Sequence, residues 1–488
     1  MKSSYTGEFN FVKYLDKVVN AETILYTGKV VAVKGLEIES EGPRSVIGEI
    51  CTIKLSNGSK LQAEVVGLEG KIVKLSPFGE TKGIEVGCVV VGSGHGLMVP
   101  VGKHLLGRMI NASGRPCDDK GEIVPDTYYP AVANPPAPNE RTDINRRIVT
   151  GVRAIDSMLT VGKGQRLGIF AGSGVGKSTL LSIIARNTNA DINVIGLIGE
   201  RGREVLDFVN RDLGEEGMKR SVIVVATSDE PSICRLRAAQ VCTAVAEYFR
   251  DQGKDVMLMM DSVTRFAHAQ REIGLANGEP PAQKGYPPSV FDMIPKLLER
   301  SGTNQKGSIT AFYTVLVDGD DMNEPITDKV RGTLDGHIVL NRKLAQAYHY
   351  PAIDILQSIS RLSKRVTGLQ TRKAVGKIRT WMSTYQENET MITAGIYQKG
   401  NNPHVDEAID KYDEIEEFLK QEEYEPCPIE DTLAKLSKIT GIEIPEDEYV
   451  ENPAANIKNT AQVVDAQAGS SASDQNEQTT DLLAKNKQ

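Results

Sequence analysis

The fold of the central part of this chain is decided by the stretch Gln165–Ser178, which reads QRLGIFAGSGVGKS. Its first six residues form a mostly apolar run typical of a buried strand, and a glycine-rich turn and a helix follow them. In such a turn the backbone N–H groups point inward at an anion, and the positive end of the helix dipole adds to the attraction. The stretch therefore predicts a phosphate-binding loop between a strand and a helix.

The loop matches the nucleotide-binding pattern at every position but the first, where Ala171 replaces the usual glycine with the next smallest residue. In this pattern Lys177 reaches the β and γ phosphates, and the Ser178 hydroxyl binds Mg²⁺. We therefore predict ATP as the substrate and Mg²⁺ as the cofactor. The predicted nucleotide-binding residues of the loop are Gly172, Ser173, Gly174, Val175, Gly176, Lys177, Ser178 and Thr179.

An acidic residue closes a second apolar run, Val256–Met260, which is followed directly by Asp261. A carboxylate at the C-terminal end of a parallel strand faces the ligand crevice, where it can hold Mg²⁺ through a water molecule. The alternative is a helix cap, because Ser262 comes next. The phosphate-binding loop favours the metal role.

A third apolar run, Val194–Ile198, leads into Gly199–Glu204, which reads GERGRE. Hydrolysis needs a carboxylate that orients and polarises a water molecule, and Glu200 has the position for that role. Arg201 is the candidate for neutralising the γ-phosphate. Without further context, a solvated charge run at the start of a helix is the simpler interpretation of these residues.

The spacing of apolar residues divides the chain into several parts. Residues 9–19 have apolar side chains at helical spacing. Such a helix can pack on its own domain or bind a partner, and the sequence favours neither alternative. Short β-rich runs follow and predict a small barrel, with a type I′ turn at Asn57-Gly58. The predicted parts are an amphipathic helix (1–22), a β-barrel (23–95), an α/β domain (96–365, with a proline-rich linker at 134–138), a helical domain (366–450) and a disordered tail (451–488).

The α/β domain is predicted to have a mostly parallel sheet, because β-rich and helical runs alternate along it. The strand candidates are Gln165–Phe170, Val194–Gly199, Ser221–Thr227, Asp255–Asp261 and Ile309–Val317, with helices such as Thr179–Asn187 and Ser232–Asp251 between them. The tail after residue 451 has no aromatic residue, and it cannot bury enough apolar surface to offset its ordering entropy.

Composition excludes several classes of function. The net charge of −8 and the balance of acidic and basic residues among the first ninety argue against a nucleic-acid partner. The six cysteines form no Cys-x-x-Cys pair, so neither a zinc site nor a disulfide framework is expected. The chain has no signal peptide and no run near the ~20 apolar residues of a membrane span, which predicts a cytoplasmic protein.

Several segments together resemble one family, the rotary-type ATPases, and within it the export ATPases of flagellar and type III secretion systems. The segments are Ala171–Ser178, Gly199–Glu204, Met260–Phe266, Gly285–Phe291 and Asp335–Leu340. Ser262 after the aspartate and the run Asp320–Ile326 resemble the export branch, whereas the catalytic subunit of the F-type synthase usually differs there. The resemblance extends from about residue 20 to about residue 440.

The resemblance implies a β-barrel, a RecA-like core, a helical C-terminal domain and a ring of six identical subunits with ATP between neighbours. It also implies that Tyr350 stacks on adenine and that Arg361 is an arginine finger that reaches the neighbour's γ-phosphate. From the residues alone, Tyr350 is a loop aromatic and Arg361 is one of several surface bases. The implied partners are further copies of the chain, a stator-like regulator at the N-terminus, a central stalk protein, export chaperone–substrate complexes and, peripherally, the inner-membrane export gate.

Four functions follow from these observations. The main prediction is an ATPase that energises flagellar protein export, because the segment Gly274–Pro281 is more similar to the flagellar form. The alternatives are the ATPase of a virulence injectisome, a non-catalytic nucleotide-binding subunit and a Rho-type RNA translocase. Glu200 argues against the non-catalytic subunit, and the balanced charge of the first ninety residues argues against the RNA translocase.

Overall fold

The computed structural model describes residues 25–453 except 36, 318 and 320. The chain forms two compact units, Met1–Leu97 and Met98–Gln488. The amphipathic helix predicted within residues 1–22 lies outside the described residues, and so does the tail from residue 454 onward. Over the part that is described, every helix is too short or too polar to span a lipid bilayer.

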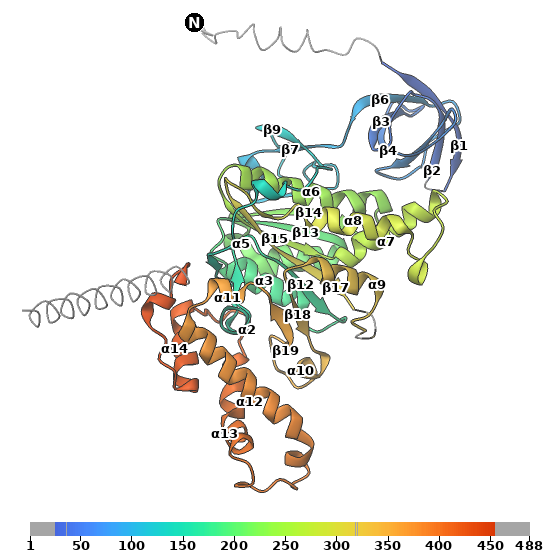
Figure 1. Ribbon diagram of the computed structural model, residues 1–488. Helices are drawn as coiled ribbons and strands as arrows, with labels where there is room; N and C mark the ends of the chain where they lie inside the picture. Colours follow the sequence, from blue (N-terminus) through green and yellow to red (C-terminus); the bar gives the residue numbers. More distant parts are fainter. Residues whose placement is uncertain (1–24, 36, 318, 320, 454–488) are drawn as a thin grey trace, which may run out of the picture. The chain divides into compact units, whose positions relative to one another are not determined.

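The first unit is a closed barrel of six antiparallel strands in the order β1-β2-β5-β4-β3-β6, which confirms the predicted barrel (Figure 1). Its strands are β1 (Thr27–Lys34), β2 (Glu37–Glu41), β3 (Glu49–Lys54), β4 (Lys60–Glu69), β5 (Ile72–Pro77) and β6 (Val89–Gly96). Alternate side chains of each strand point inward. Fully buried Val30, Ile38, Ile53, Val65 and Leu75 fill the interior.

The turn between β3 and β4 differs from the predicted type I′ turn. Gly58 has a positive φ of 84°, but Asn57 is not among the residues with positive φ, and a type I′ turn requires both. The Gly58 N–H donates to the Leu55 carbonyl at 3.0 Å, and the Leu55 N–H donates to the Ser59 carbonyl at 2.9 Å. The loop therefore has three residues, 56–58, with the left-handed glycine at its end, where glycine adopts a positive φ without strain.

The second unit is built around a mostly parallel sheet in the order β19-β18-β12-β17-β15-β13-β14-β8, in which β19 runs antiparallel to β18 and a short ninth strand, β16 (Gly302–Thr303), runs antiparallel to β17. Its strands are β8 (Arg108–Asn111), β12 (Arg166–Ala171), β13 (Ile192–Glu200), β14 (Ser221–Thr227), β15 (Asp255–Asp261), β17 (Ser308–Leu316), β18 (Gly336–Leu340) and β19 (Ile353–Ser360). All five strand candidates from the sequence are confirmed as β12, β13, β14, β15 and β17. Outside this sheet, short strands pair as β7 (Met98–Val101) with β9 (Thr127–Pro130) and as β10 (Arg147–Ile148) with β11 (Val161–Gly162).

Helices cover both faces of this sheet (Figure 1). On strand β13, Asn193 faces helix α3 (Lys177–Asn187) and donates from its amide to the Ala185 carbonyl at 2.8 Å. Gly196 lies on the opposite face, where a Cβ would stand 3.0 Å from Cys242 of helix α6 (Ser232–Asp251). The central strand β13 is therefore covered by a helix on each face of the sheet. The other helices of this α/β region are α2 (Arg153–Met158), α4 (Gly202–Asp207), α5 (Gly214–Lys219), α7 (Val263–Ala276), α8 (Pro288–Leu298), α9 (Pro325–Thr333), α10 (Arg342–Gln346) and α11 (Ser363–Val366).

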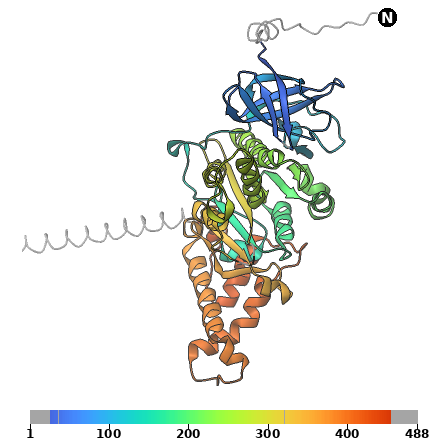
Figure 2. The same ribbon diagram turned by 90° about the vertical axis from the view of Figure 1, so that its right-hand side faces the viewer.

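The C-terminal part is helical, as predicted. Helices α12 (Leu369–Thr393) and α13 (Pro403–Leu419) run side by side, and α14 (Ile429–Thr440) packs against both and against α2 (Figure 2). Their buried residues Trp381, Phe418 and Leu433 belong to the same apolar core as β12 and α3. The helical part therefore shares a core with the phosphate-binding region.

Candidate active site

The phosphate-binding loop lies between β12 and α3, where the sequence places it. Gly174 and Gly176 have φ values of 76° and 90°, a left-handed conformation that glycine adopts at no steric cost. Gly176 precedes Lys177, the first residue of α3, so the free N–H groups of the helix start face the loop. The eight predicted loop residues are thus contiguous around one anion-binding turn.

Lys177 and Asp261 form the centre of the site. The Lys177 Nζ lies 2.5 Å from the Asp261 Oδ1, and the side chains are 12% and 3% exposed. The Thr314 hydroxyl donates to the same carboxylate oxygen at 2.8 Å. Thr314 belongs to β17, which lies between β12, the strand that precedes the phosphate-binding loop, and β15, which ends at Asp261. The helix-cap alternative for Asp261 does not hold, because Ser262 caps α7 by accepting from the Arg265 N–H.

Glu200 ends β13 and approaches the same lysine, with its Oε1 3.9 Å from the Lys177 Nζ. Burial, followed by the nearby charge of Asp261, raises the pKa of Glu200 to about 7, although Lys177 acts in the opposite direction. A carboxyl group whose pKa lies near neutrality is suited to proton transfer at physiological pH. Glu200 therefore stays the candidate for the general base.

The donor set fits Mg²⁺. Asp261 and Glu200 share a single lysine, which leaves excess negative charge beside the phosphate-binding loop. The available ligand atoms are carboxylate oxygens and the hydroxyl of Ser178, and Mg²⁺ prefers hard oxygen ligands from one or two carboxylates together with substrate phosphates. Ser178 and Asp261 are therefore the residues we would assign to the metal.

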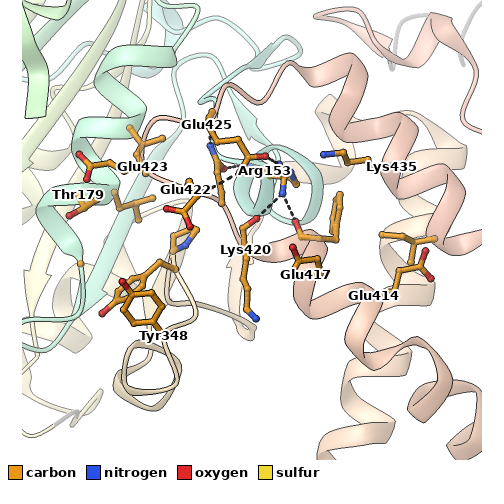
Figure 3. A pocket seen from close by; sticks show the side chains of 18 of the residues that line it. Arg153, Thr179, Tyr348, Glu414, Glu417, Lys420, Glu422, Glu423, Glu425 and Lys435 are labelled. Carbon is orange, nitrogen blue, oxygen red and sulfur yellow. Dashed lines mark hydrogen bonds and ion pairs between the residues drawn. The ribbon is translucent and has the colours of Figure 1, made fainter.

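Tyr350 lies beside the phosphate-binding loop and lines a cavity of about 770 Å³. Figure 3 shows this cavity between Thr179 of α3 and Glu414 and Glu417 of α13. The ring packs over Gly176, where a Cβ would stand 3.5 Å from two ring carbons. Tyr350 is 38% exposed, so part of the residue is accessible to solvent. Thr179 and Phe418 line the same cavity. An adenine base bound next to the loop would fit this space.

The segment after α13 fixes one wall of this cavity. Arg153 is 5% exposed, and its guanidinium donates to the carbonyls of Phe418 at 3.2 Å and Lys420 at 2.7 Å and pairs with Glu425 (Figure 3). The Gln421 N–H donates to the Tyr350 carbonyl at 2.9 Å. The Tyr350 loop is therefore anchored to the C-terminal helices.

Two predicted site residues lie apart from this cluster. Arg201 is 81% exposed at its side chain and pairs with Glu204 at 3.2 Å, so it points to solvent in the single chain. Arg361 follows β19, whose last residue pairs with the first residue of β18, so it lies at the N-terminal ends of the parallel strands. Its N–H donates to the Asp335 carbonyl, and the Asp335 N–H donates to the carbonyl of Arg166, which starts β12. Arg361 is thus level with Arg166, which is five residues before Ala171, the last residue of β12. Along the strand, these five residues span roughly 17 Å.

Three family models match successive parts of the chain. Residues 30–94 match the beta-barrel domain of the ATP synthase alpha/beta family, and residues 151–360 match its nucleotide-binding domain. Residues 367–438 match the C-terminal domain of the T3SS EscN ATPase. These matches follow the barrel, the sheet with its phosphate-binding loop, and the C-terminal helices in order.

Relatives and solved structures agree with these matches. A flagellum-specific ATP synthase of Treponema pallidum is 57% identical over 88% of this chain and 97% of its own length, and one of Bacillus subtilis is 54% identical over 85% and 95%. A type 3 secretion system ATPase of Xanthomonas euvesicatoria is 49% identical over 85% and 94%. The assembled ATPase EscN of enteropathogenic E. coli superposes with a TM-score of 0.81 at 44% identity, over 85% of this chain and all of that one. This chain therefore belongs to the ATP synthase alpha/beta family, and it is an ATPase of the branch that holds the flagellum-specific and type 3 secretion ATPases.

Proposed function

We propose that this protein hydrolyses ATP at the subunit interfaces of a homohexamer and thereby energises protein export through a flagellar type III secretion apparatus. The observation that carries this proposal is the separation of two half-sites in one chain. Lys177, Asp261 and Glu200 meet at the C-terminal ends of the parallel strands. Arg361 lies at the N-terminal ends of those strands, because Ser360 pairs with Gly336 at the start of β18. One chain cannot close its own site, and a ring brings the two halves together.

Each residue of the cluster has a defined part in the proposed reaction. Lys177 neutralises charge on the β and γ phosphates, and Mg²⁺ held by Ser178 and Asp261 supplies further electrostatic stabilisation when it is bound. Glu200 accepts a proton from the water that attacks the γ-phosphate. Binding of the nucleotide draws Lys177 from the carboxylate to the phosphates.

The neighbouring subunit supplies the remaining charge. Arg361 reaches the γ-phosphate from the adjacent chain, where a planar guanidinium spreads its charge over several donors that fit a phosphoryl group. We assign Arg201 to the same phosphate. Arg201 follows Glu200 directly in the chain, and its present partner is only a surface carboxylate, which supports a contact with the γ-phosphate that its own chain binds. Tyr350 stacks on the adenine.

The flagellar assignment is supported by the names of the relatives. Three with 57%, 54% and 50% identity are flagellum-specific ATP synthases, while the type 3 secretion ATPases reach 49%. We propose a central stalk protein as a partner, because EscN has been solved in complex with its central stalk EscO at a TM-score of 0.79 to this chain. We also propose a stator-like regulator at the N-terminus, export chaperone–substrate complexes, and a cytoplasmic location peripheral to the inner-membrane export gate.

Three measurements test the proposal. The purified full-length chain should hydrolyse ATP without RNA, and a chain that binds nucleotide without hydrolysing it would instead be a non-catalytic subunit. In the source organism, deletion of the gene should stop filament assembly, and the wild-type gene but not a Lys177→Ala copy should restore it. Normal flagella in the deletion strain, with loss of another secreted protein set, would favour the injectisome. Removal of residues 1–20 should abolish regulator binding and spare basal hydrolysis.

A further inference from the structure

The turn that carries Arg361 is bound to an ion pair between Asp335 and Arg166, the first residue of β12. The Asp335 carboxylate accepts from the Arg166 Nε at 3.0 Å, from its Nη2 at 3.1 Å and from its backbone N–H at 3.1 Å. The backbone carbonyl of the same aspartate accepts the Arg361 N–H at 3.1 Å. Asp335 therefore links a bidentate side-chain pair to the backbone of the finger residue.

A second pair of contacts fixes the same turn. Gln165 is fully buried, and its amide donates to the Asp335 carbonyl at 3.2 Å and to the Ser360 hydroxyl at 3.0 Å. Ser360 donates in turn to the carbonyl of Thr160 at 2.9 Å. The residue before the finger and the residue that accepts its N–H are thus tied to one buried side chain.

The guanidinium of Arg361, by contrast, is exposed, and among the residues that the structure describes no hydrogen bond or ion pair holds it. Its direction is therefore set by the backbone of the turn alone. A long side chain that must reach a phosphate on another subunit loses accuracy when its backbone anchor moves, and a misplacement of about 1 Å can cost ~10²-fold in rate.

We propose that Asp335, clamped by Arg166, is a positioning residue that aims Arg361 at the nucleotide of the neighbouring subunit. The inference rests on the proposed ring in which Arg361 acts on the next chain. It assigns a catalytic effect to a pair that touches neither the nucleotide nor the phosphate-binding loop of its own chain. The pair acts through geometry, so it should change turnover and leave nucleotide affinity unchanged.

Asp335→Asn tests this in the full-length chain, because it keeps the size of the side chain and removes one of the two carboxylate charges on Arg166. The other, Glu299, pairs with the Arg166 Nη1 at 2.5 Å and does not contact the Arg361 turn through any contact described above. We expect kcat to fall between about 10-fold and 10²-fold, with the KM for ATP and the affinity for a fluorescent ADP analogue unchanged. The matched control is Asp328→Asn on α9, which removes an exposed pair with Arg331 and should leave kcat unchanged.

Mixed rings separate a defect in the finger from a defect in the chain's own site. Lys177→Ala has a defective loop and an intact finger, so co-assembly with Asp335→Asn should restore hydrolysis above either variant alone. The same mixture of Lys177→Ala with Arg361→Ala tests the ring itself. Rescue of Arg361→Ala without rescue of Asp335→Asn would overturn the positioning role and leave the proposed function standing. Failure of both mixtures would contradict the shared site and, with it, the positioning role.

A second variant covers the case in which Asp335→Asn does not assemble. Arg166→Lys keeps the positive charge and loses the two parallel hydrogen bonds to Asp335, since ammonium groups do not form the planar fork. It should show the same fall in kcat, the same unchanged ADP affinity and the same rescue by Lys177→Ala. Wild-type kcat in assembled Arg166→Lys rings would refute the positioning role.

Discussion

Lys177 holds Asp261 through a 2.5 Å contact between its Nζ and the Oδ1, so the cation of the phosphate-binding loop is paired with a buried carboxylate. The same lysine lies 3.9 Å from Glu200. It is the cation that the two carboxylates share, and an incoming phosphate would compete with them for it. We therefore expect movement of this lysine to the phosphates to favour nucleotide binding and to remove a charge that lowers the pKa of Glu200.

Lys177→Ala should abolish steady-state ATP hydrolysis, because the β and γ phosphates lose their principal cation and the two carboxylates then repel them. The measurement is phosphate release by the purified full-length variant at saturating ATP. Lys219→Ala is the control, since that lysine pairs only with the exposed Glu216 on α5 and should not matter. Wild-type turnover in Lys177→Ala would remove the lysine from the site.

Glu200→Gln should lower kcat by about 10²- to 10⁴-fold and keep nucleotide binding, because the amide has the size of the carboxylate but cannot accept a proton. In the wild-type protein, kcat/KM should rise as the pH increases through about 7, the pKa of this group in the free enzyme. Glu215→Gln, on the exposed start of α5, is the control. A kcat/KM that is flat between pH 5.5 and 8.5, roughly the range around that pKa, would contradict the base assignment.

The same shift predicts a dependence of stability on pH. The pKa of Glu200 is about 7 in the folded protein, and its ordinary value, which applies to the unfolded chain, is 4.5. Between pH 4.5 and about pH 7 the native state therefore binds more protons than the unfolded state. Stability should therefore fall as the pH rises from about 4.5 to about 7, and the decrease should be smaller in Glu200→Gln. Urea midpoints of the nucleotide-free proteins across this window measure it. Equal decreases in both proteins would show that Glu200 does not carry the shift.

Tyr350→Ala should raise the KM for ATP without a matching fall in kcat, because it removes stacking that the ground state and the transition state share. Loss of base–aromatic stacking costs about 1–3 kcal/mol, so the change should be roughly 5-fold to 10²-fold. Tyr350→Phe keeps the ring and is the matched control. A wild-type KM for Tyr350→Ala would place the adenine elsewhere in the cavity.

The sequence predicted the parts of this protein that have a local pattern. The loop at Gly172–Ser178, the strand that ends at Asp261 and the helix Ser232–Asp251 each follow from spacing and flanking residues, and the structure has them at those positions. The turn type at Asn57-Gly58 could not be predicted, because both loop lengths use a left-handed glycine and only the backbone of Asn57 distinguishes them.

Contacts between residues that are far apart in the chain could not be predicted, because no local sequence pattern marks them. Thr314 lies within the apolar run of β17, and its bond to Asp261 depends on which strands are neighbours in the sheet. Asp335 and Arg166 are far apart in the chain and become partners because β18 adds beside β12. The position of Arg361 at the N-terminal ends of the parallel strands likewise depends on the antiparallel direction of β19.

Arg361→Ala should leave nucleotide binding and ring assembly intact and lower hydrolysis by about 10³-fold or more, as loss of an arginine finger does in other NTPases. The reason is positional, because Arg361 lies at the end of the parallel strands opposite its own phosphate-binding loop and can complete only a neighbour's site. Specific activity of the wild-type protein should then fall when it is diluted below the concentration at which rings dissociate, followed in parallel by light scattering. Lys364→Ala, an exposed base three residues further on, is the control for lost surface charge. Activity that stays constant through ring dissociation would mean that one chain closes its own site.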